Sequence, residues 1–168
     1  MKVVQVNIAA TELMLFTPLP QIHMANVMLD YKQVQKDEIL TLEYINSESI
    51  SKMFFEITSL QPTIVAFSVY MWNYKAVDQL SESIKNMYGS NCWIVWGSPH
   101  VSEDPLVFLN KNKSYVDFLV TWYGEKPMLD ITKAYIDSKG DLNIGKEILI
   151  DKRAKGIYFY GDFKNNIK

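Results

Sequence analysis

Cysteine is almost absent from this 168-residue chain, in which Cys92 is the single example. One cysteine excludes an internal disulfide, and it excludes a zinc or iron–sulfur site built only from cysteines of this chain. We therefore expect no iron–sulfur cluster within it. So few cysteines also fit a reducing compartment, and we predict a cytoplasmic protein.

Charge of one sign and long apolar runs are also lacking. The 17 basic and 19 acidic residues leave a formal net charge of -2, which creates no basic field to attract nucleic acid. Polar residues interrupt the apolar N-terminus, so it does not match a signal peptide. No segment approaches the roughly 20 apolar residues that a membrane-spanning helix needs. We predict neither a nucleic-acid partner nor a membrane partner.

Apolar residues are plentiful, at 48%, and their spacing predicts alternating strands and helices. Apolar runs predict strands at residues 1–8, 39–45, 63–67, 92–96 and 115–121. Helical spacing predicts helices at residues 19–33, 50–60, 74–88 and 127–136, with a short one after Asp104. This alternation is typical of the α/β class. We predict a Rossmann-like (flavodoxin-like) five-stranded parallel sheet flanked by helices.

The pattern changes near the C-terminus. Residues 147–150, 156–160 and the tail each suggest a short strand, joined by turns at 151–152 and 161–162. We therefore divide the chain into an α/β domain at residues 1–137 and a short β-hairpin-like extension at residues 138–168.

Polar and aromatic residues follow the third predicted strand, which lies in the stretch QPTIVAFSVYMWNY at residues 61–74. Its unbroken apolar run fits a strand buried on both faces, and ligands bind at the carboxyl ends of such strands. The run delivers Ser68, Tyr70, Trp72 and Asn73 to that edge. Loops at 97–100 and 122–125 should reach the same edge, and with few charges they suit a large, flat, mostly neutral ligand.

Common catalytic and nucleotide-binding motifs do not occur. The sequence has no GxxxxGK[ST], no GxGxxG after the first strand and no GxSxG. A flavodoxin-like nucleotide binder is disfavoured because the first loop, AATELMLFTPLP, contains no glycine. His23 and His100 have no neighbouring histidine or acidic cluster, so we predict no metal site and no catalytic residue.

Three motifs resemble the N-terminal cobalamin-binding domain of cobalamin-dependent radical SAM proteins. The family pattern G-F-S-x-Y-x-W-N is matched by residues 67–73, G-G-P-x-x-S by residues 97–102, and a G-E-G-E segment by residues 124–125. The motifs occur in the family's order and spacing, and the resemblance covers about residues 1–160.

The resemblance implies a cobalamin cofactor whose corrin lies over the carboxyl ends of the strands. Ser68 and Tyr70 would line the corrin or its tail, and Gly97, Ser98 and Gly124 would lie against the nucleotide tail. The full predicted cofactor-binding set is Ser68, Tyr70, Trp72, Asn73, Gly97, Ser98, Pro99, Gly124 and Glu125.

The chain departs from the family at two of these loops. Ser98 stands where the family has the second glycine of a pair, and Trp122-Tyr123 replaces the first Gly-Glu of the fifth-strand segment. The sequence also lacks a D-x-H-x-x-G motif, which in methionine-synthase-like domains supplies an axial histidine.

The sequence lacks the C-x3-C-x2-C arrangement of a radical SAM cluster. We therefore expect a cobalamin-binding domain or accessory subunit of a radical SAM methyltransferase-like system, not catalytic alone, with a radical SAM protein or domain as partner. The alternative is a degenerate interaction or dimerisation module that no longer binds cobalamin. In that case Ser98, Trp122 and Tyr123 would fill the pocket, and the chain could form a homo-oligomer.

Overall fold

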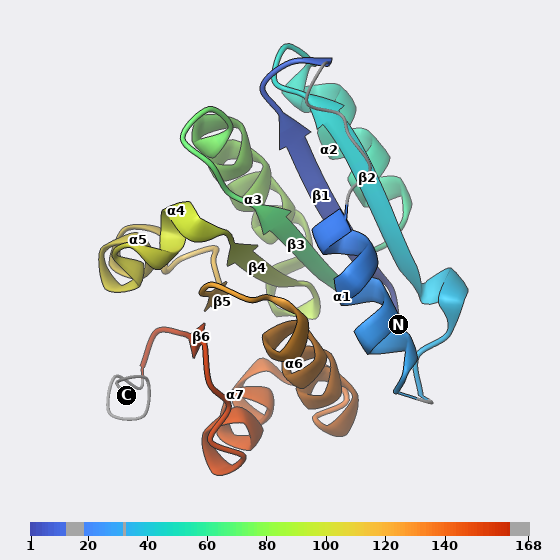
Figure 1. Cartoon of the computed structure of the whole chain (residues 1–168), viewed down its shortest axis with the longest axis vertical. Coiled ribbons are helices and arrows are strands. Elements are labelled where there is room, and N and C mark those ends of the chain that lie inside the picture. The colour runs from blue at the N-terminus through green and yellow to red at the C-terminus, as the bar shows by residue number, and fades with distance from the viewer. Residues whose placement is uncertain (13–18, 32, 162–168) are drawn as a thin grey trace.

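A computed structural model describes residues 1–12, 19–31 and 33–161 of the chain (Figure 1). Its strands are β1 (Val3–Ala9), β2 (Ile39–Ile45), β3 (Ile64–Ser68), β4 (Trp93–Gly97), β5 (Phe118–Val120) and β6 (Ile157–Tyr158). Its α-helices are α1 (Leu19–Leu29), α2 (Ile50–Ser59), α3 (Tyr74–Tyr88), α4 (Pro99–Ser102), α5 (Pro105–Asn112), α6 (Glu125–Asp137) and α7 (Leu142–Asp151). Short 3₁₀ helices, η2 (Lys36–Glu38) and η3 (Gly89–Asn91), precede β2 and β4.

The strands form one sheet in the order β2-β1-β3-β4-β5-β6. Strands β1 to β5 are mutually parallel, and β6 runs antiparallel to β5. This arrangement confirms the predicted Rossmann-like α/β fold with its five parallel strands. The chain reverses its direction of winding between β1 and β3, and such a switch point leaves a crevice at the carboxyl ends of the two strands.

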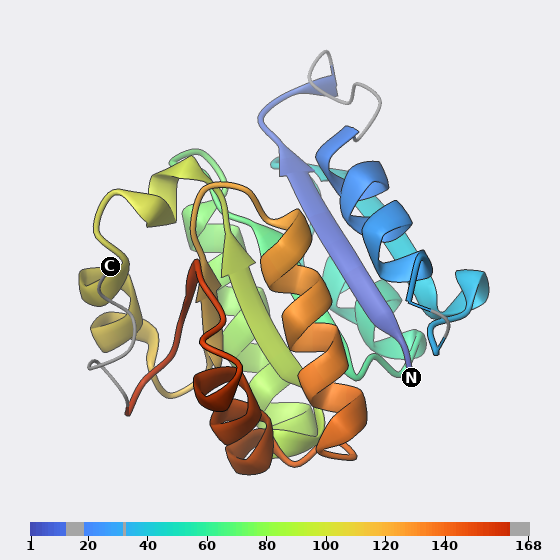
Figure 2. The same ribbon diagram turned by 60° about the horizontal axis from the view of Figure 1, so that its bottom comes forward.

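Helices cover both faces of the sheet, as Figures 1 and 2 show. On one face, buried side chains of α2, α3 and α5 pack against alternate strand residues such as Val4, Val65 and Ile94. On the other face, α1, α6 and α7 pack against the intervening residues, among them Val3 and Trp93. Strands with two buried faces explain why their sequences read as unbroken apolar runs.

The C-terminal prediction was partly wrong. Residues 147–150, predicted as a strand, lie in α7. Asp141 begins this helix by accepting hydrogen bonds from the backbone N–H groups of Asn143 and Ile144. The helix packs closely against the sheet at Gly145, where an added Cβ would lie 2.4 Å from the Trp93 ring. Packing against Trp93 therefore decides the helical state of this apolar run.

The second predicted C-terminal strand is present but pairs differently. It shortens to β6 and pairs with β5 instead of forming a hairpin within the extension. The third lies in residues 162–168, outside the described residues. The domain boundary after residue 137 stays a prediction. Within the part of the chain that the structure describes, no helix is both long and apolar enough to cross a bilayer.

Candidate functional site

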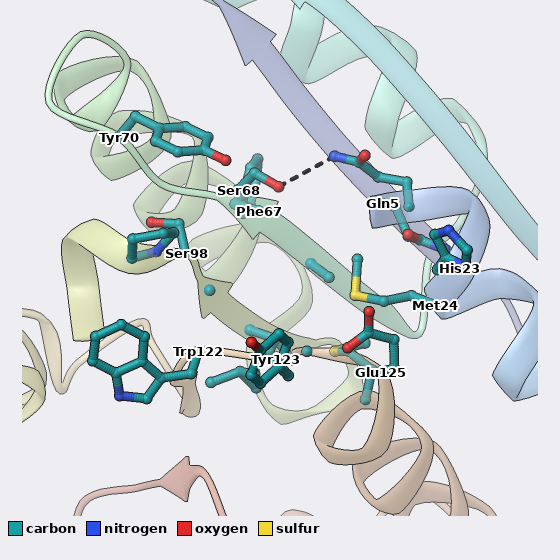
Figure 3. Close-up of a pocket in the computed structure, with 18 residues that line it drawn as sticks. Gln5, His23, Met24, Phe67, Ser68, Tyr70, Ser98, Trp122, Tyr123 and Glu125 are labelled. Atoms are coloured by element: carbon teal, nitrogen blue, oxygen red, sulfur yellow. Dashed lines mark hydrogen bonds between the residues drawn. The ribbon is translucent and has the colours of Figure 1, made fainter. Parts of the chain in front are cut away.

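A cavity of about 400 Å³ opens at the carboxyl edge of the sheet, between α1 and α6 (Figure 3). It lies at the switch point that the strand order creates, and its floor is formed by β1, β3 and β4. Its lining residues are Gln5, Gln21, His23, Met24, Ala66, Phe67, Ser68, Tyr70, Val95, Gly97, Ser98, Pro99, Val120, Trp122, Tyr123, Gly124, Glu125 and Met128.

The structure brings most of the predicted site residues to this cavity. Those that line it are Ser68, Tyr70, Gly97, Ser98, Pro99, Gly124 and Glu125. They come from three loops far apart in the sequence, which meet because parallel strands end at a common edge. Trp72 and Asn73 are not among the lining residues. That any of these residues binds a cofactor remains a prediction.

Asn73 is a buried structural clamp. Its amide nitrogen donates to the carbonyl oxygens of Ile8, at 3.0 Å, and Ser68, at 2.9 Å. Its carbonyl oxygen accepts from the backbone N–H of Tyr70 at 2.7 Å. The side chain is fully inaccessible to solvent. Asn73 therefore ties the ends of β1 and β3 together and shapes the loop that carries Tyr70.

Trp72 stacks on the ring of Tyr70 and supports it. The two rings stack with centroids 4.5 Å apart and an angle of 6° between their planes. The indole N–H of Trp72 donates to the carbonyl oxygen of Ile8 at 3.2 Å. A stacked partner and an anchored indole hold the Tyr70 ring at the cavity.

Ser98 and Trp122 adopt backbone conformations that favour glycine. Ser98 has φ 149° and Trp122 has φ 58°, both uncommon for residues with a Cβ. They occupy the two positions where this sequence differs from the glycines of the cobalamin-domain motifs that it resembles. Both loops therefore follow a backbone path suited to glycine, although the residues there carry side chains.

Hydrogen bonds hold this strained pair in place. The Ser98 hydroxyl donates to the carbonyl oxygen of Val69 and accepts from the backbone N–H of His100. Ser102 links the two loops, because its hydroxyl donates to the Ser98 carbonyl oxygen at 2.7 Å and accepts from the Trp122 backbone N–H at 2.9 Å.

The aromatic side chains at the mouth leave the cavity open. Trp122 is 71% exposed and Tyr123 is 86% exposed. The Ser98 side chain is turned toward the backbone of Val69 by its hydrogen bond. The expectation attached to the alternative function, that these three residues fill the pocket, is therefore wrong.

The sequence did not reveal the polar floor of the cavity. Gln5 lies on β1 and is 1% exposed, and Gln21 lies on α1 and is 4% exposed. The Gln21 amide donates to the Ser68 hydroxyl at 3.2 Å, as the dashed line in Figure 3 marks. The one available signal was a glutamine inside the valine-rich run VVQV. Met24, Val95, Val120 and Met128 complete the walls and were missed because apolar residues look alike whether they line a cavity or fill a core.

The two histidines differ in position. His23 lines the cavity from α1. The His100 ring instead meets Phe108 edge to face, with centroids 5.2 Å apart. Among the described residues, no group of three or more His, Cys, Asp or Glu side chains is arranged to hold a metal ion. Glu125 begins α6, where a carboxylate is stabilised by the helix dipole.

Strand order, switch point and cavity together define a doubly wound α/β domain with a cavity at the position where such folds bind ligands. No protein-family model matches the chain. It is 27% identical over 104 residues to the cobalamin-dependent radical SAM methyltransferase TokK of Streptomyces tokunonensis, a match covering 57% of this chain and 15% of TokK.

A solved structure shares the fold. The cobalamin-dependent S-adenosylmethionine radical enzyme OxsB, determined with aqua-cobalamin bound, matches with a TM-score of 0.59 and 17% identity. The match covers 99% of this chain and 22% of OxsB. Both proteins are cobalamin-dependent radical SAM enzymes, which confirms the resemblance predicted from the three motifs. The chain spans less than a quarter of the length of either.

Proposed function

We propose that this chain binds a cobalamin-type corrinoid at the carboxyl edge of its sheet and serves a radical SAM methyltransferase-like system. The observation that carries the proposal is the open cavity at the β1–β3 switch point, where the three motif loops meet. The similarity to TokK and to cobalamin-bound OxsB supports the choice of ligand. When bound, methylcobalamin supplies the methyl group for transfer.

The lining of the cavity fits part of such a ligand. Ala66, Val95 and Val120 give apolar walls, which suit the faces of a flat ring. Gly97 lines the cavity and has no side chain, so its backbone is open to close approach by a ligand. A space of about 400 Å³ accepts one end of a corrinoid and leaves the remainder at the rim, beside Tyr70 and Trp122.

A radical SAM protein or domain is the partner we propose. Radical SAM chemistry needs three cysteine ligands for its cluster, and this sequence has one cysteine. That cysteine, Cys92, is buried directly before β4, at the amino edge of the sheet and opposite the cavity. The partner would therefore supply the cluster, while this chain holds and orients the corrinoid.

Retention of hydroxocobalamin tests the proposal. The chain is incubated with hydroxocobalamin, desalted and examined for corrin absorbance, which we expect to remain with the protein. Ala66→Phe should abolish retention, because the ring would occupy the cavity floor. Phe55→Ser is the matched control, since Phe55 is 72% exposed on α2 and lies outside the cavity. The absence of retained corrin at high protein concentration contradicts the proposal.

A second candidate function, an interaction or dimerisation module, is favoured by the exposed aromatic rim. Trp72 is 42% exposed after β3, and Trp122 and Tyr123, which follow β5, are 71% and 86% exposed. Exposed aromatic clusters mark protein interfaces. Light scattering distinguishes this candidate: a dimer that dissociates in the double variant Trp122→Ser, Tyr123→Ser supports it. A monomer at all concentrations contradicts self-association.

A further inference from the structure

Gln5 carries an amide that is buried and has no hydrogen-bond partner. Both its Nε2 and its Oε1 are inaccessible to solvent and unpaired within the described residues. The side chain belongs to the lining of the cavity at the carboxyl edge, on the α1 side of the view in Figure 3. The neighbouring Gln21 amide, in contrast, is bonded to the Ser68 hydroxyl.

An unpaired buried amide is costly, and an apolar residue at this position would avoid the cost. The flanking residues of β1, Val4 and Val6, are apolar and buried. Leaving a buried donor or acceptor without a partner destabilises a fold, because the group loses its hydrogen bonds to water and gains none in return. Native proteins therefore satisfy almost all such groups. The amide atoms are closed to solvent in the ligand-free structure, so a group that enters the cavity pairs with them when the Gln5 side chain turns toward it. That pairing explains why glutamine is present here.

We propose that Gln5 recognises the edge of a planar nitrogen heterocycle that carries a hydrogen-bond donor beside an acceptor, as adenine does. A glutamine amide presents one acceptor and one donor in a single plane, and it pairs in two-point fashion with the adenine edge. Ala66, Val95 and Met24 offer apolar surfaces to the faces of such a ring. The free amide thus selects the edge of the ring and the walls accept its faces.

This inference rests on the proposed function, because it assigns the heterocycle to the nucleotide of a bound corrinoid. Corrinoids differ in that base. A dimethylbenzimidazole attached through one ring nitrogen offers one acceptor and no donor, so it pairs with Nε2 and leaves Oε1 buried and unpaired. An adenine base pairs with both atoms. The cavity should therefore prefer an adenine-bearing corrinoid to cobalamin itself.

The test measures the affinity of the chain for three corrinoids: one with an adenine nucleotide, cobalamin, and cobinamide, which has no nucleotide. We expect the adenine form to bind on the order of tenfold more tightly than cobalamin, the effect of one additional satisfied hydrogen bond. Gln5→Met should erase that preference. Gln79→Met is the matched control and should keep it, because Gln79 is exposed on α3 and lies outside the cavity. Equal affinities in the wild type, or a preference that survives Gln5→Met, overturn the inference.

A second measurement separates this inference from the proposed function. Free adenine and free 5,6-dimethylbenzimidazole are titrated while the methyl NMR signals of Met24 and Met128 in the cavity are followed. If no corrinoid binds, the proposed function fails, but adenine binding that Gln5→Met removes still supports the role of Gln5. If adenine causes no shift, the inference is overturned. Thermal unfolding checks that Gln5→Met folds, and without ligand its Tm should rise because the unpaired amide is gone.

Discussion

The two edges of the sheet are built in opposite ways. At the amino edge, the buried Asp117 carboxylate accepts from the Ile94 backbone N–H at 2.7 Å and from Lys85 Nζ at 2.7 and 2.9 Å. Lys85 also donates to the carbonyl oxygen of Cys92 at 3.1 Å. At the carboxyl edge, Gln5 is unpaired within the described residues, and Ser98 and Trp122 hold backbone conformations that suit glycine.

The two edges differ in whether their polar groups are already paired within the chain. Every polar group of the Asp117 cluster points to another group of the chain, so the amino edge is complete without a ligand. The carboxyl edge keeps a cavity, an unpaired amide and local strain, features that proteins maintain at functional sites. Substitutions at the amino edge should therefore lower the free energy of unfolding, whereas those at the carboxyl edge should also affect ligand retention. The expected effects range from large losses in the free energy of unfolding to a difference in thiol reactivity alone.

Removing the cation of the amino-edge cluster should have the largest effect on the free energy of unfolding. Lys85→Met leaves the Asp117 carboxylate buried without its cation, and we expect a loss of about 3–5 kcal/mol in the free energy of unfolding. Urea unfolding measures it. Lys152→Met is the control, because Lys152 pairs with Asp137 where both side chains are 40% or more exposed, and such a pair contributes about 0–1 kcal/mol. Similar losses in both variants contradict the prediction.

The loss in Lys85→Met should depend on pH. Burial already raises the pKa of Asp117 above its ordinary value, while Lys85 opposes that rise. Without Lys85 the pKa rises further, so the folded protein holds a proton more tightly than the unfolded chain. Stability then falls as the pH rises from the unfolded pKa through the folded one. The deficit measured near pH 4 should therefore be smaller than at pH 7.

At the carboxyl edge, Asn73→Ala should cost about 2–3 kcal/mol, because the carbonyl oxygens of Ile8 and Ser68 and the N–H of Tyr70 lose their shared partner. Corrin retention should fall with it, since the loop carrying Tyr70 is released. Trp72→Phe is the comparison: it keeps an aromatic ring beside Tyr70 and loses a single hydrogen bond. An Asn73→Ala protein as stable as wild type contradicts the clamp.

At position 98 glycine should give a more stable protein than alanine, the reverse of their usual order in a helix. Both substitutions remove the hydroxyl, but only Ser98→Gly also removes the Cβ that is strained at φ 149°. We expect Ser98→Gly to be more stable than Ser98→Ala by about 1–2 kcal/mol. The same pair of changes at Ser59, an exposed residue of helix α2, should follow the ordinary helix preference for alanine.

Cys92 should be inert in the folded protein. Burial raises the pKa of its thiol to about 12, so the thiolate that reacts with disulfide reagents is scarce at pH 8. The folded chain should react slowly with a thiol-specific disulfide reagent, and the chain in 6–8 M urea, roughly the range that unfolds small domains, should react fully. Fast reaction of the native protein contradicts this expectation.

Several features followed from local sequence pattern alone. Unbroken valine- and isoleucine-rich runs such as residues 63–67 predicted strands buried on both faces, and their alternation with helices predicted the parallel sheet. Parallel strands end at one edge, so the order of the elements was enough to place the loops at Ser68, Gly97 and Gly124 together. The helix cap at Asp104 and the glycine after Tyr88 were equally readable, because capping depends on neighbours in the chain.

Only tertiary structure decided the rest. The run at 147–150 became part of α7 because Gly145 packs against Trp93, more than 50 residues away. Asn73 proved to be a clamp because its partners on β1 come within reach only in the folded sheet. Gln5 and the glycine-like backbone of Ser98 and Trp122 could not be recognised from residue type. The sequence by itself determined which elements form and which loops share an edge, whereas long-range packing determined which side chains at that edge are left without a partner.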